Sequence, residues 1–364
     1  MATQIHVLNA LLRSVVRSST PTRIAVLAIL LAIAFVALVY VKPPAAPPDG
    51  GEVAFMFWNV ENLFDDRDDK RNSIDEPFDD WMAKDAEARK LKLDRLVEVI
   101  LKVNSGRGPD IFAGCEVESY RAVELLRDAL NAKLPAGAVK YEHIAMKELD
   151  ANAGRYIAPC VISRIPLDEA KTRLMGRFNL RILETRLTKN NADLRLVVSH
   201  WTSQRSDDGT KKGSGRDKYA TVLREDFERA MKENPQADYL LCGDFNTTPD
   251  SEVVTDQLRM TGNKDDAAKN MKLFGLLSDK SADKFGTHYY SKPLIYDQIG
   301  VSPGMLDGKG WSCDPESIQV PTDGLIRDKA RVRRPWRFGD KDENPQGRGY
   351  SDHFPVVVKL KVAE

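Results

Sequence analysis

An unbroken apolar run from Ile24 to Val41 limits what the N-terminal part of this chain can become. Its length approaches the roughly 20 apolar residues that cross a bilayer as a helix. A buried core helix would show a polar face, and this run has none. A cleavable signal peptide usually has an apolar core of about 7–15 residues before a small-residue cleavage site, whereas this run ends in Val-Tyr-Val-Lys. We therefore predict an uncleaved signal-anchor, a single transmembrane helix over residues 24–41.

The basic residues around this run predict its orientation. Arg13, Arg17 and Arg23 precede it, and only Lys42 follows closely. Because basic residues stay on the cytoplasmic side, we expect residues 1–23 in the cytoplasm and the rest exported, to the periplasm or the cell exterior. Residues 42–52 are rich in proline and predict a stiff, extended linker. Residues 53–364 then form one globular domain.

The composition excludes few classes of function. Lysine plus arginine number 54 and aspartate plus glutamate 54, and this balance neither indicates nor excludes a nucleic-acid partner, because local patches decide such binding. None of the four cysteines forms a Cys-x-x-Cys pair, so a zinc knuckle or a redox motif is not expected. Cys115, Cys160 and Cys242 lie in apolar stretches and are predicted to be buried without disulfides.

Hydrophobic periodicity predicts many short strands and a few long helices. The strands are expected at 53–58, 110–115, 160–163, 180–187, 194–199, 239–242, 295–301 and 354–360, and the helices at 86–103, 121–133 and 219–232. This mixture is typical of two packed sheets with helices outside. The order of the strands does not follow from it.

Polar residues recur where the predicted strands begin or end. They are Asn59, Glu116, His200, Asp244, Asn246, Asp297, Asp352 and His353. One such residue proves little, since strands often end in Asp or Asn turns, but eight such residues at six places in one chain can converge on a single pocket. Glu, Asp and Asn are oxygen ligands suited to Mg²⁺, Mn²⁺ or Ca²⁺. A hard cation with a His–Asp pair that deprotonates water is suited to phosphoryl chemistry.

These motifs resemble the successive signatures of the endonuclease/exonuclease/phosphatase superfamily. They are Phe-Trp-Asn59-Val-Glu-Asn, Cys-Glu116-Val-Glu, Ser-His200-Trp, Gly-Asp244-Phe-Asn246, Tyr-Asp297-Gln-Ile and Ser-Asp352-His353. They follow the family's order over roughly residues 53–362. The resemblance implies a four-layered α/β sandwich, two packed mixed β-sheets flanked by helices, and a metal-dependent phosphodiesterase.

The resemblance also implies a role for each motif residue. Glu116 would be the principal ligand of a divalent cation, most simply Mg²⁺, with Asn59 and Asp352 close to it. His353 would activate the attacking water and Asp297 would orient His353.

Four further residues complete the expected site. Asp244 would position the water or help to deprotonate it. Asn246 would hold the phosphate, and His200 would donate to the phosphoryl oxygen as its charge grows. Arg216 lies where relatives with a His-Trp motif carry an arginine that braces the site; a solvent-facing helix residue is the alternative.

Tyr156 and Glu118 leave two interpretations open. Tyr156 precedes Ser163-Arg164 at the spacing of the family's Tyr-to-Ser-Arg segment, which implies a catalytic or phosphate-binding role. However, Pro159 and Cys160 replace the small residues that are usual there, and an ordinary packed tyrosine is the alternative. Glu118 is expected to be a solvated or supporting carboxylate rather than a metal ligand.

Two charged segments also have alternative interpretations. The acidic run 65–80 is expected to be a solvated loop, with a second cation site as the alternative. The basic segment 327–337, which contains Trp336, could flank the site and contact phosphates and bases, or it could be a solvated loop.

The core motifs do not choose a substrate. Ser-His200-Trp-Thr-Ser-Gln-Arg205 resembles the His-Trp-Pro-Ser-Arg region of bacterial secreted nucleases, although Thr202 replaces the proline. This favours nucleic acid, DNA or RNA. A phosphodiesterase or phosphatase acting on lipid head groups or inositol phosphates is the alternative, and a non-catalytic binding protein is a weaker one. No protein partner is inferred.

Overall fold

The computed structural model describes residues 51–72, 74–149, 154–176, 180–204, 215–327, 332–344 and 347–363. The predicted anchor at 24–41, its cytoplasmic flank and most of the linker lie outside these residues. Among the helices of the described ranges, none combines the length and apolar character needed to span a bilayer.

The first sheet has six strands and contains both ends of the described chain. Its order is β14-β15-β1-β2-β4-β3. The strands are β1 (Glu52–Leu63), β2 (Ile111–Val117), β3 (His143–Met146), β4 (Ala158–Ser163), β14 (Trp311–Gln319) and β15 (Val356–Val362). Strand β1 runs parallel to β2 and antiparallel to β15. The carboxyl ends of β1 and β2 therefore share one edge of the sheet with the start of β15.

The second sheet has seven strands in the order β5-β6-β7-β8-β13-β10-β9. They are β5 (Arg173–Leu174), β6 (Ile182–Lys189), β7 (Ala192–His200), β8 (Asp238–Asp244), β9 (Met260–Thr261), β10 (Leu273–Gly275) and β13 (Asp297–Val301). Strand β7 is parallel to β8, and β13 is antiparallel to β8. The ends of β7 and β8 thus lie beside the start of β13. A separate hairpin joins β11 (His288–Tyr290) to β12 (Lys292–Leu294).

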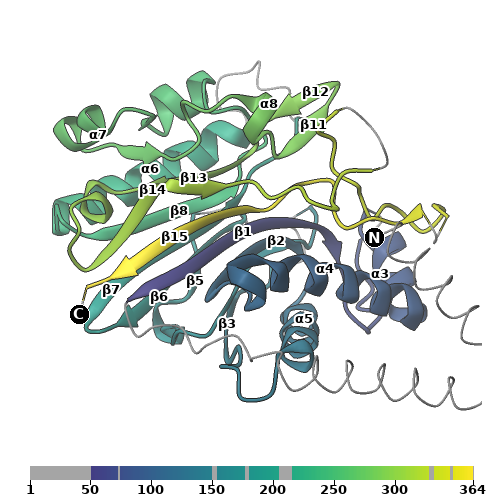
Figure 1. The fold of residues 1–364 in the computed structure, drawn as a ribbon. Helices are drawn as coiled ribbons and strands as arrows, with labels where there is room; N and C mark the ends of the chain where they lie inside the picture. Colours follow the sequence, from purple (N-terminus) through teal and green to yellow (C-terminus); the bar gives the residue numbers. More distant parts are fainter. Residues whose placement is uncertain are drawn as a thin grey trace, which may run out of the picture. The chain divides into compact units, whose positions relative to one another are not determined.

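Helices cover the outer faces of the two sheets (Figure 1). On the side of β1 and β2 lie α3 (Glu76–Lys84), α4 (Ala86–Gly106) and α5 (Tyr120–Lys133). On the side of β8 and β13 lie α6 (Gly215–Glu233) and α7 (Lys264–Asn270). The shorter helical segments are α8 (Ala282–Phe285), η1 (Glu169–Lys171), η2 (Val253–Gln257) and η3 (Pro303–Leu306).

Amphipathic patterns explain the packing of the long helices. In α4, Leu96 and Ile100 are one turn apart and buried, as the 3.6-residue period predicts. Asp85 caps the helix by accepting a hydrogen bond from the Ala88 N–H at 2.9 Å. The helix ends where Asn104 enters the left-handed region at a φ of 53°. In α6, Tyr219, Leu223 and Phe227 recur on one face and pack in a second apolar cluster with Trp201 and Phe245.

The inner faces of the two sheets form the main core. Phe55 and Phe57 of β1 share one apolar cluster with Leu196 and Val198 of β7 and Leu240 of β8. The core also takes up the cysteines: Cys115, Cys160, Cys242 and Cys313 are all buried and free. The predictions of two mixed sheets flanked by helices and of buried cysteines without disulfides are therefore confirmed.

The predicted strands and helices are all present, with ends shifted by a few residues. Two interpretations were incomplete. The acidic run 65–80 is not entirely a loop, because Glu76 begins α3. Strand β14 was not expected, because Asp314 and Pro315 interrupt its apolar residues.

Candidate active site

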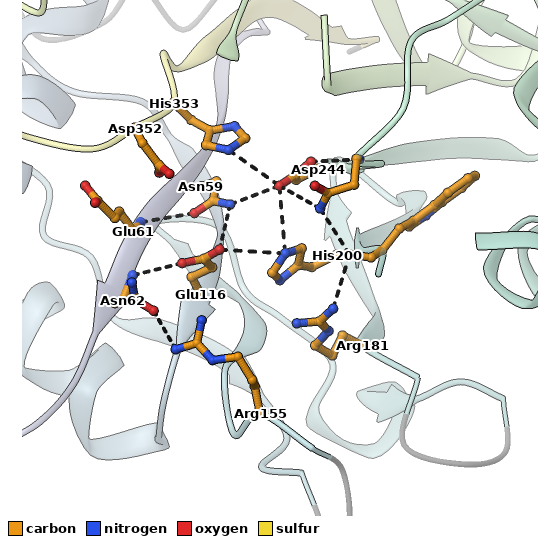
Figure 2. Close-up of polar contacts among 12 residues, drawn as sticks. Asn59, Glu61, Asn62, Glu116, Arg155, Arg181, His200, Asp244, Asp352 and His353 are labelled. Carbon is orange, nitrogen blue, oxygen red and sulfur yellow. Dashed lines mark hydrogen bonds and ion pairs between the residues drawn. The ribbon is translucent and has the colours of Figure 1, made fainter. Parts of the chain in front are cut away.

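The motif residues of the two sheets lie close together. In the first sheet, Asn59 is paired in register with Cys115, whose neighbour is Glu116. In the second sheet, His200 and Asp297 both lie opposite Asp244. All are at the edge where the parallel strands end, and the loop before β15 carries Asp352 and His353 to the same edge. Figure 2 shows side chains of β1, β2, β7 and β8 and of the loop before β15 close together.

Asn59 connects the two sheets at the centre of this group. Its side-chain amide donates to Glu116 Oε1 at 3.2 Å and to Asp244 Oδ2 at 3.0 Å. Its amide oxygen accepts from the Glu61 N–H at 3.0 Å. Glu116 also accepts from the Asn62 N–H at 3.1 Å. Since Asn59 is fully buried, these bonds fix its orientation, and it holds two carboxylates of different sheets in one geometry.

His353 and Asp297 form a buried dyad. Nδ1 of His353 lies 2.6 Å from Asp297 Oδ2, and Nε2 faces Asp244 Oδ2 at 3.7 Å. Burial opposes a charge on His353, but the carboxylates of Asp297 and Asp244 outweigh it and raise the pKa of His353 well above its usual value. Burial also raises the pKa of Asp244 to about 7.

Hydrogen bonds with neighbouring side chains hold the backbone of the dyad in place. The Ser351 hydroxyl donates to the carbonyl of Asn59 at 2.7 Å and accepts from the His353 N–H at 3.1 Å. The Trp58 indole donates to the His353 carbonyl at 2.8 Å. On the other side, the Thr287 hydroxyl accepts from the Asp297 N–H at 3.0 Å. Such supporting contacts preorganise a site at little cost during reaction.

His200 lies on the far side of Asp244 from the dyad. Its Nε2 is 3.8 Å from both Glu116 Oε1 and Asp244 Oδ2. Burial lowers its pKa well below the usual value, so the ring is neutral and acts as a hydrogen-bond donor rather than a fixed charge. Asn246 lies next to it, with its amide donating to the Trp201 carbonyl at 3.1 Å and to Asp244 Oδ2 at 3.3 Å.

Four non-glycine residues of the site have left-handed backbones. The φ values are 52° for Glu61, 55° for Asn62, 65° for Glu116 and 51° for Asn246. Such conformations are uncommon outside glycine and persist where the surroundings impose them, often at functional sites. At Glu116 the consequence is visible: β2 pairs with β4 through a register shift between Gly114 and Val117, which turns the carboxylate toward Asn59.

The donor set fits a hard divalent cation. Glu116 and Asp352 supply carboxylates, and the Asn59 side-chain amide holds the Glu116 carboxylate in place. Within the described residues, the Asp352 carboxylate accepts no hydrogen bond, and although burial opposes its charge, His353 and His288 keep its pKa below the usual value. An ionised oxygen ligand without a protein donor is suited to Mg²⁺, Mn²⁺ or Ca²⁺. Carboxylate and histidine groups also gather at Asp244, Asp297 and His353.

The structure therefore brings together eight of the predicted site residues: Asn59, Glu116, His200, Asp244, Asn246, Asp297, Asp352 and His353. Arg216 is buried in the first turn of α6 and donates to the Thr202 carbonyl at 3.4 Å, a contact that suits the predicted brace. The backbone N–H of Tyr156 donates to Asp75 at 2.7 Å, and the Arg71 guanidinium lies 4.7 Å from the centre of its ring. Its chemical role stays a prediction.

Side chains of both charged segments form contacts within the protein. In the acidic run, Asp79 accepts the backbone N–H groups of Asp69 and Arg71. Glu118 is ion-paired with Arg71 at 2.8 Å, a supporting role as expected. These internal donors argue against a second cation site there.

In the basic segment, Arg333 donates to the carbonyls of Gly286 and Val320, and Arg337 is ion-paired with Glu61 at 3.0 Å. Trp336 donates to the Gly347 carbonyl. These side chains hold the loop to the domain. Residues 328–331 lie outside the described residues, and contact of the segment with phosphates and bases stays a prediction.

Three residues at the site were not predicted. Glu61 belongs to the Phe-Trp-Asn-Val-Glu-Asn motif, and its carboxylate accepts the backbone N–H groups of Phe338 and Gly339. Arg155 and Arg181 flank Glu116 and His200 (Figure 2). Nothing in the sequence around either arginine separates it from the many other basic residues; only the adjacency of Arg155 to Tyr156 pointed toward the site.

Comparisons with known structures agree with this architecture. The crystal structure of TDP2 from Caenorhabditis elegans is 14% identical, with 91% of this chain and 80% of that chain covered and a TM-score of 0.51. An endonuclease/exonuclease/phosphatase family protein from Bacteroides thetaiotaomicron is 16% identical, covering 87% and 100%, with a TM-score of 0.48. Beta toxin from Staphylococcus aureus is 15% identical, covering 84% and 99%, with a TM-score of 0.47. At 14% identity, the likeness to the Caenorhabditis elegans structure shows a shared fold alone.

Sequence comparison identifies the family. No curated protein matches the chain. The family model described as Endonuclease/Exonuclease/phosphatase family, however, matches residues 53–362, which include both sheets and every residue of the central group. The chain belongs to the endonuclease/exonuclease/phosphatase family.

Proposed function

We propose that this hydrolase of phosphoric ester bonds cleaves the phosphodiester backbone of nucleic acid, with Mg²⁺ as its cation. The observation that supports the chemistry best is the hydrogen-bonded group that joins Glu116, Asn59 and Asp244 to the His353–Asp297 dyad. It places an oxygen-ligand set, a water-activating base and a neutral donor within one polar cluster.

The roles of the side chains follow from their contacts. Glu116 and Asp352 would hold the cation, with the Asn59 side chain beside them, and the bound cation would neutralise charge on the phosphate. Nε2 of His353 takes the proton of the attacking water, while Asp297 holds the ring in the tautomer that exposes Nε2. Asp244 accepts the second hydrogen of that water. His200 and Asn246 donate to the phosphoryl oxygens as charge develops on them.

Nucleic acid is favoured over other phosphodiesters by the segment after β7. Ser199-His200-Trp201 and the residues up to Arg205 resemble the corresponding region of bacterial secreted nucleases. Gln204 connects this segment to Asn246 by donating to its carbonyl at 3.2 Å. One observation favours a lipid substrate instead: Tyr290, at the turn of the β11–β12 hairpin, has 62% of its surface exposed. The base of that hairpin carries His288, whose ring lies 4.4 Å from that of His353.

A substrate panel tests this proposal. The full-length chain, purified in mild detergent, is assayed on plasmid DNA, single-stranded RNA, sphingomyelin, phosphatidylinositol phosphates and bis-p-nitrophenyl phosphate. Each is tested with Mg²⁺, Mn²⁺, Ca²⁺ and EDTA, beside His353→Ala and Glu116→Ala. Chelator-sensitive cleavage of nucleic acid that both variants lose supports the proposal. Cleavage of lipid alone transfers the same chemistry to the alternative substrate, and inactivity on every substrate by a folded protein contradicts catalysis.

We also propose that the catalytic domain is exported and held at the membrane by residues 24–41, because the basic residues lie before the apolar run. One fusion and one extraction test this. A reporter that is active only after export, joined behind the domain, should be active, and alkaline carbonate should leave the full-length protein in the membrane pellet. Release of the protein by carbonate would show that the segment is cleaved or does not span.

A further inference from the structure

Two arginines beside the active site have no part in the chemistry described above. Arg155 precedes β4 and Arg181 precedes β6. Figure 2 shows both on the side of Glu116 and His200 that lies away from His353 and Asp352. One side of this polar group therefore carries the carboxylates that would bind the cation. The other side carries two guanidinium groups.

Arg181 is held in place by neutral groups. Its guanidinium donates to the Trp201 carbonyl at 3.1 Å and approaches the Tyr219 hydroxyl at 3.5 Å. Its carbonyl accepts the His200 N–H at 2.9 Å, which fixes the arginine next to that histidine. None of the ion pairs between described residues includes Arg181, although its side chain is only partly exposed.

Arg195 is a buried arginine with a structural role, and it serves as a comparison for Arg181. Its guanidinium is buried in the second sheet and is paired with Glu184 at 2.9 Å and with Asp226. A guanidinium removed from water without a counter-ion is unfavourable, and here two carboxylates compensate. Arg181 lacks such a partner among the described residues. Its charge is attracted by Glu116 without a direct ion pair, so its guanidinium is also available to an anion that comes from outside the chain.

Arg155 provides a second, oriented guanidinium. Asp75, which is fully buried, accepts from its Nε at 2.7 Å, and the Asn62 side chain accepts from Nη2 at 2.7 Å. Figure 2 shows the guanidinium directed toward Glu116. Both arginines act on the same neighbour: besides burial, the charges of Arg181 and Arg155 contribute to the lowered pKa of His200.

We propose that Arg155 and Arg181 form a second anion subsite, which binds a phosphate next to the one that is hydrolysed. The inference rests on the proposed function and makes it more specific. A fork of N–H donors matches the oxygens of a phosphate, and a substrate with phosphates on both sides of a sugar can fill both halves of the site. A lipid with a single phosphodiester leaves the arginines empty. The subsite thus selects a polynucleotide backbone.

A nucleotide with two phosphates tests the subsite without nuclease activity. Inhibition of bis-p-nitrophenyl phosphate hydrolysis is measured for thymidine 3′,5′-bisphosphate, thymidine 5′-monophosphate and thymidine 3′-monophosphate, with the full-length chain and saturating Mg²⁺. We expect the bisphosphate to bind at least about tenfold more tightly than either monophosphate, as one charge-assisted contact allows. Because the ratio is taken within each variant, a change in turnover does not affect it.

Substitutions assign this advantage to the arginines. The ratio of bisphosphate affinity to monophosphate affinity should fall to within about twofold of unity in both Arg181→Gln and Arg155→Gln. Arg181→Lys should keep part of the advantage. Arg259→Gln, an exposed arginine paired with Glu228, is the matched control and should keep the ratio unchanged. Circular dichroism verifies the fold of each variant. If hydrolysis of bis-p-nitrophenyl phosphate is too slow to measure, titration calorimetry in Ca²⁺ gives the same ratio from the dissociation constants.

The outcomes separate this subsite from the proposed function. A large ratio that Arg181→Gln abolishes supports the subsite even if no nucleic acid is cleaved, in which case only the proposed substrate fails. Cleavage of nucleic acid with a ratio near unity in the wild type overturns the subsite and leaves the function standing. A ratio that survives in both glutamine variants overturns it as well.

Discussion

At the scale of single residues, the His353–Asp297 contact determines how the site responds to pH. The neutral imidazole is the active base, so the rate rises as pH passes upward through the pKa of His353. Burial lowers that pKa, but the carboxylates of Asp297 and Asp244 raise it by more. The acidic limb of the rate profile therefore depends on the charge of Asp297.

Asp297→Asn should move this acidic limb to lower pH and slow the reaction. The substitution removes the largest charge that raises the pKa of His353, and it also disturbs the tautomer that exposes Nε2. We expect kcat to fall by about 10²–10⁴-fold, the range of a positioned general base. Profiles of kcat against pH at saturating Mg²⁺ measure both effects, with the exposed Asp256→Asn as control. A limb that moves to higher pH would show that Asp297 does not set the pKa of the base.

The sequence predicted the motif residues because each stands beside a strand of recognisable pattern. Glu116 and Asp352 could be assigned as ligands from their residue types and the family resemblance. Arg155 and Arg181 could not be found in this way. Their role depends on which carboxylates lie near them, and the pairing of Arg195 but not of Arg181 is decided by contacts between distant strands.

At the scale of elements, the approach of β7 and β8 depends on one glycine. A Cβ added to Gly243 would lie 2.0 Å from the carbonyl oxygen of Ser199, closer than any real contact. Gly243→Ala must therefore separate the two strands that carry His200 and Asp244. We expect unfolding to become easier by about 1–3 kcal/mol, the usual cost of overpacking, together with loss of activity.

Urea denaturation of Gly243→Ala and the wild type measures this cost. Gly347→Ala is the control, because a Cβ there meets nothing within 4 Å. Equal stability of Gly243→Ala and Gly347→Ala would mean that the strands can shift freely, contrary to the tight pairing of Ser199 with Gly243.

One arginine organises the loop that precedes β15. Arg348 donates to the carbonyls of Phe338 at 3.2 Å, Asp340 at 2.8 Å, Lys341 at 3.1 Å and Glu343 at 2.9 Å. Its guanidinium also lies 4.6 Å from the ring of Trp81. The same loop binds Glu61 through the Phe338 N–H, so it supports the site from behind.

Arg348→Met should loosen this loop, because four carbonyls lose a charged donor. We expect a loss of stability of about 2–4 kcal/mol, given the cost of unmade bonds to charged groups. Hydrogen exchange should become faster in residues 336–349 first. Arg334→Met, an exposed arginine of the same loop, is the control. Unchanged exchange in the loop would assign its order to the Glu61 contacts alone.

The elements that sequence analysis missed have a physical reason for being missed. Strand β14 contains Pro315, which cannot donate to a sheet, and its pairing with β15 shifts between Asp314 and Gln319. Proline is tolerated there because β14 is an edge strand. An interior strand such as β8 has no such interruption and was therefore predicted.

At the scale of the whole molecule, the cation and the fold should stabilise each other. Several carboxylates meet between the two sheets, so a cation that binds there favours the folded state by mass action, by about 2.7 kcal/mol at one hundred times its Kd. Mg²⁺ should raise the melting temperature relative to EDTA. Glu116→Gln should abolish the increase, and the exposed Glu252→Gln should retain it. An equal increase in both variants would place the cation elsewhere.

The two-sheet architecture was predictable because strands and helices alternate in a pattern that the family resemblance also implies. The strand order was not predictable, since it depends on pairings such as β1 with β15, whose residues are almost the length of the domain apart. Local periodicity carries no information about such partners.

That pairing also governs when the protein can become active during its own synthesis. Strand β15 is the last strand made, yet it lies inside the first sheet between β14 and β1, the first strand made. Until it emerges, β1 keeps one open edge, and long-range pairing of this kind forms late. Asp352 and His353 arrive immediately before β15. The active site therefore lacks two of its residues until nearly all of the described chain has left the ribosome.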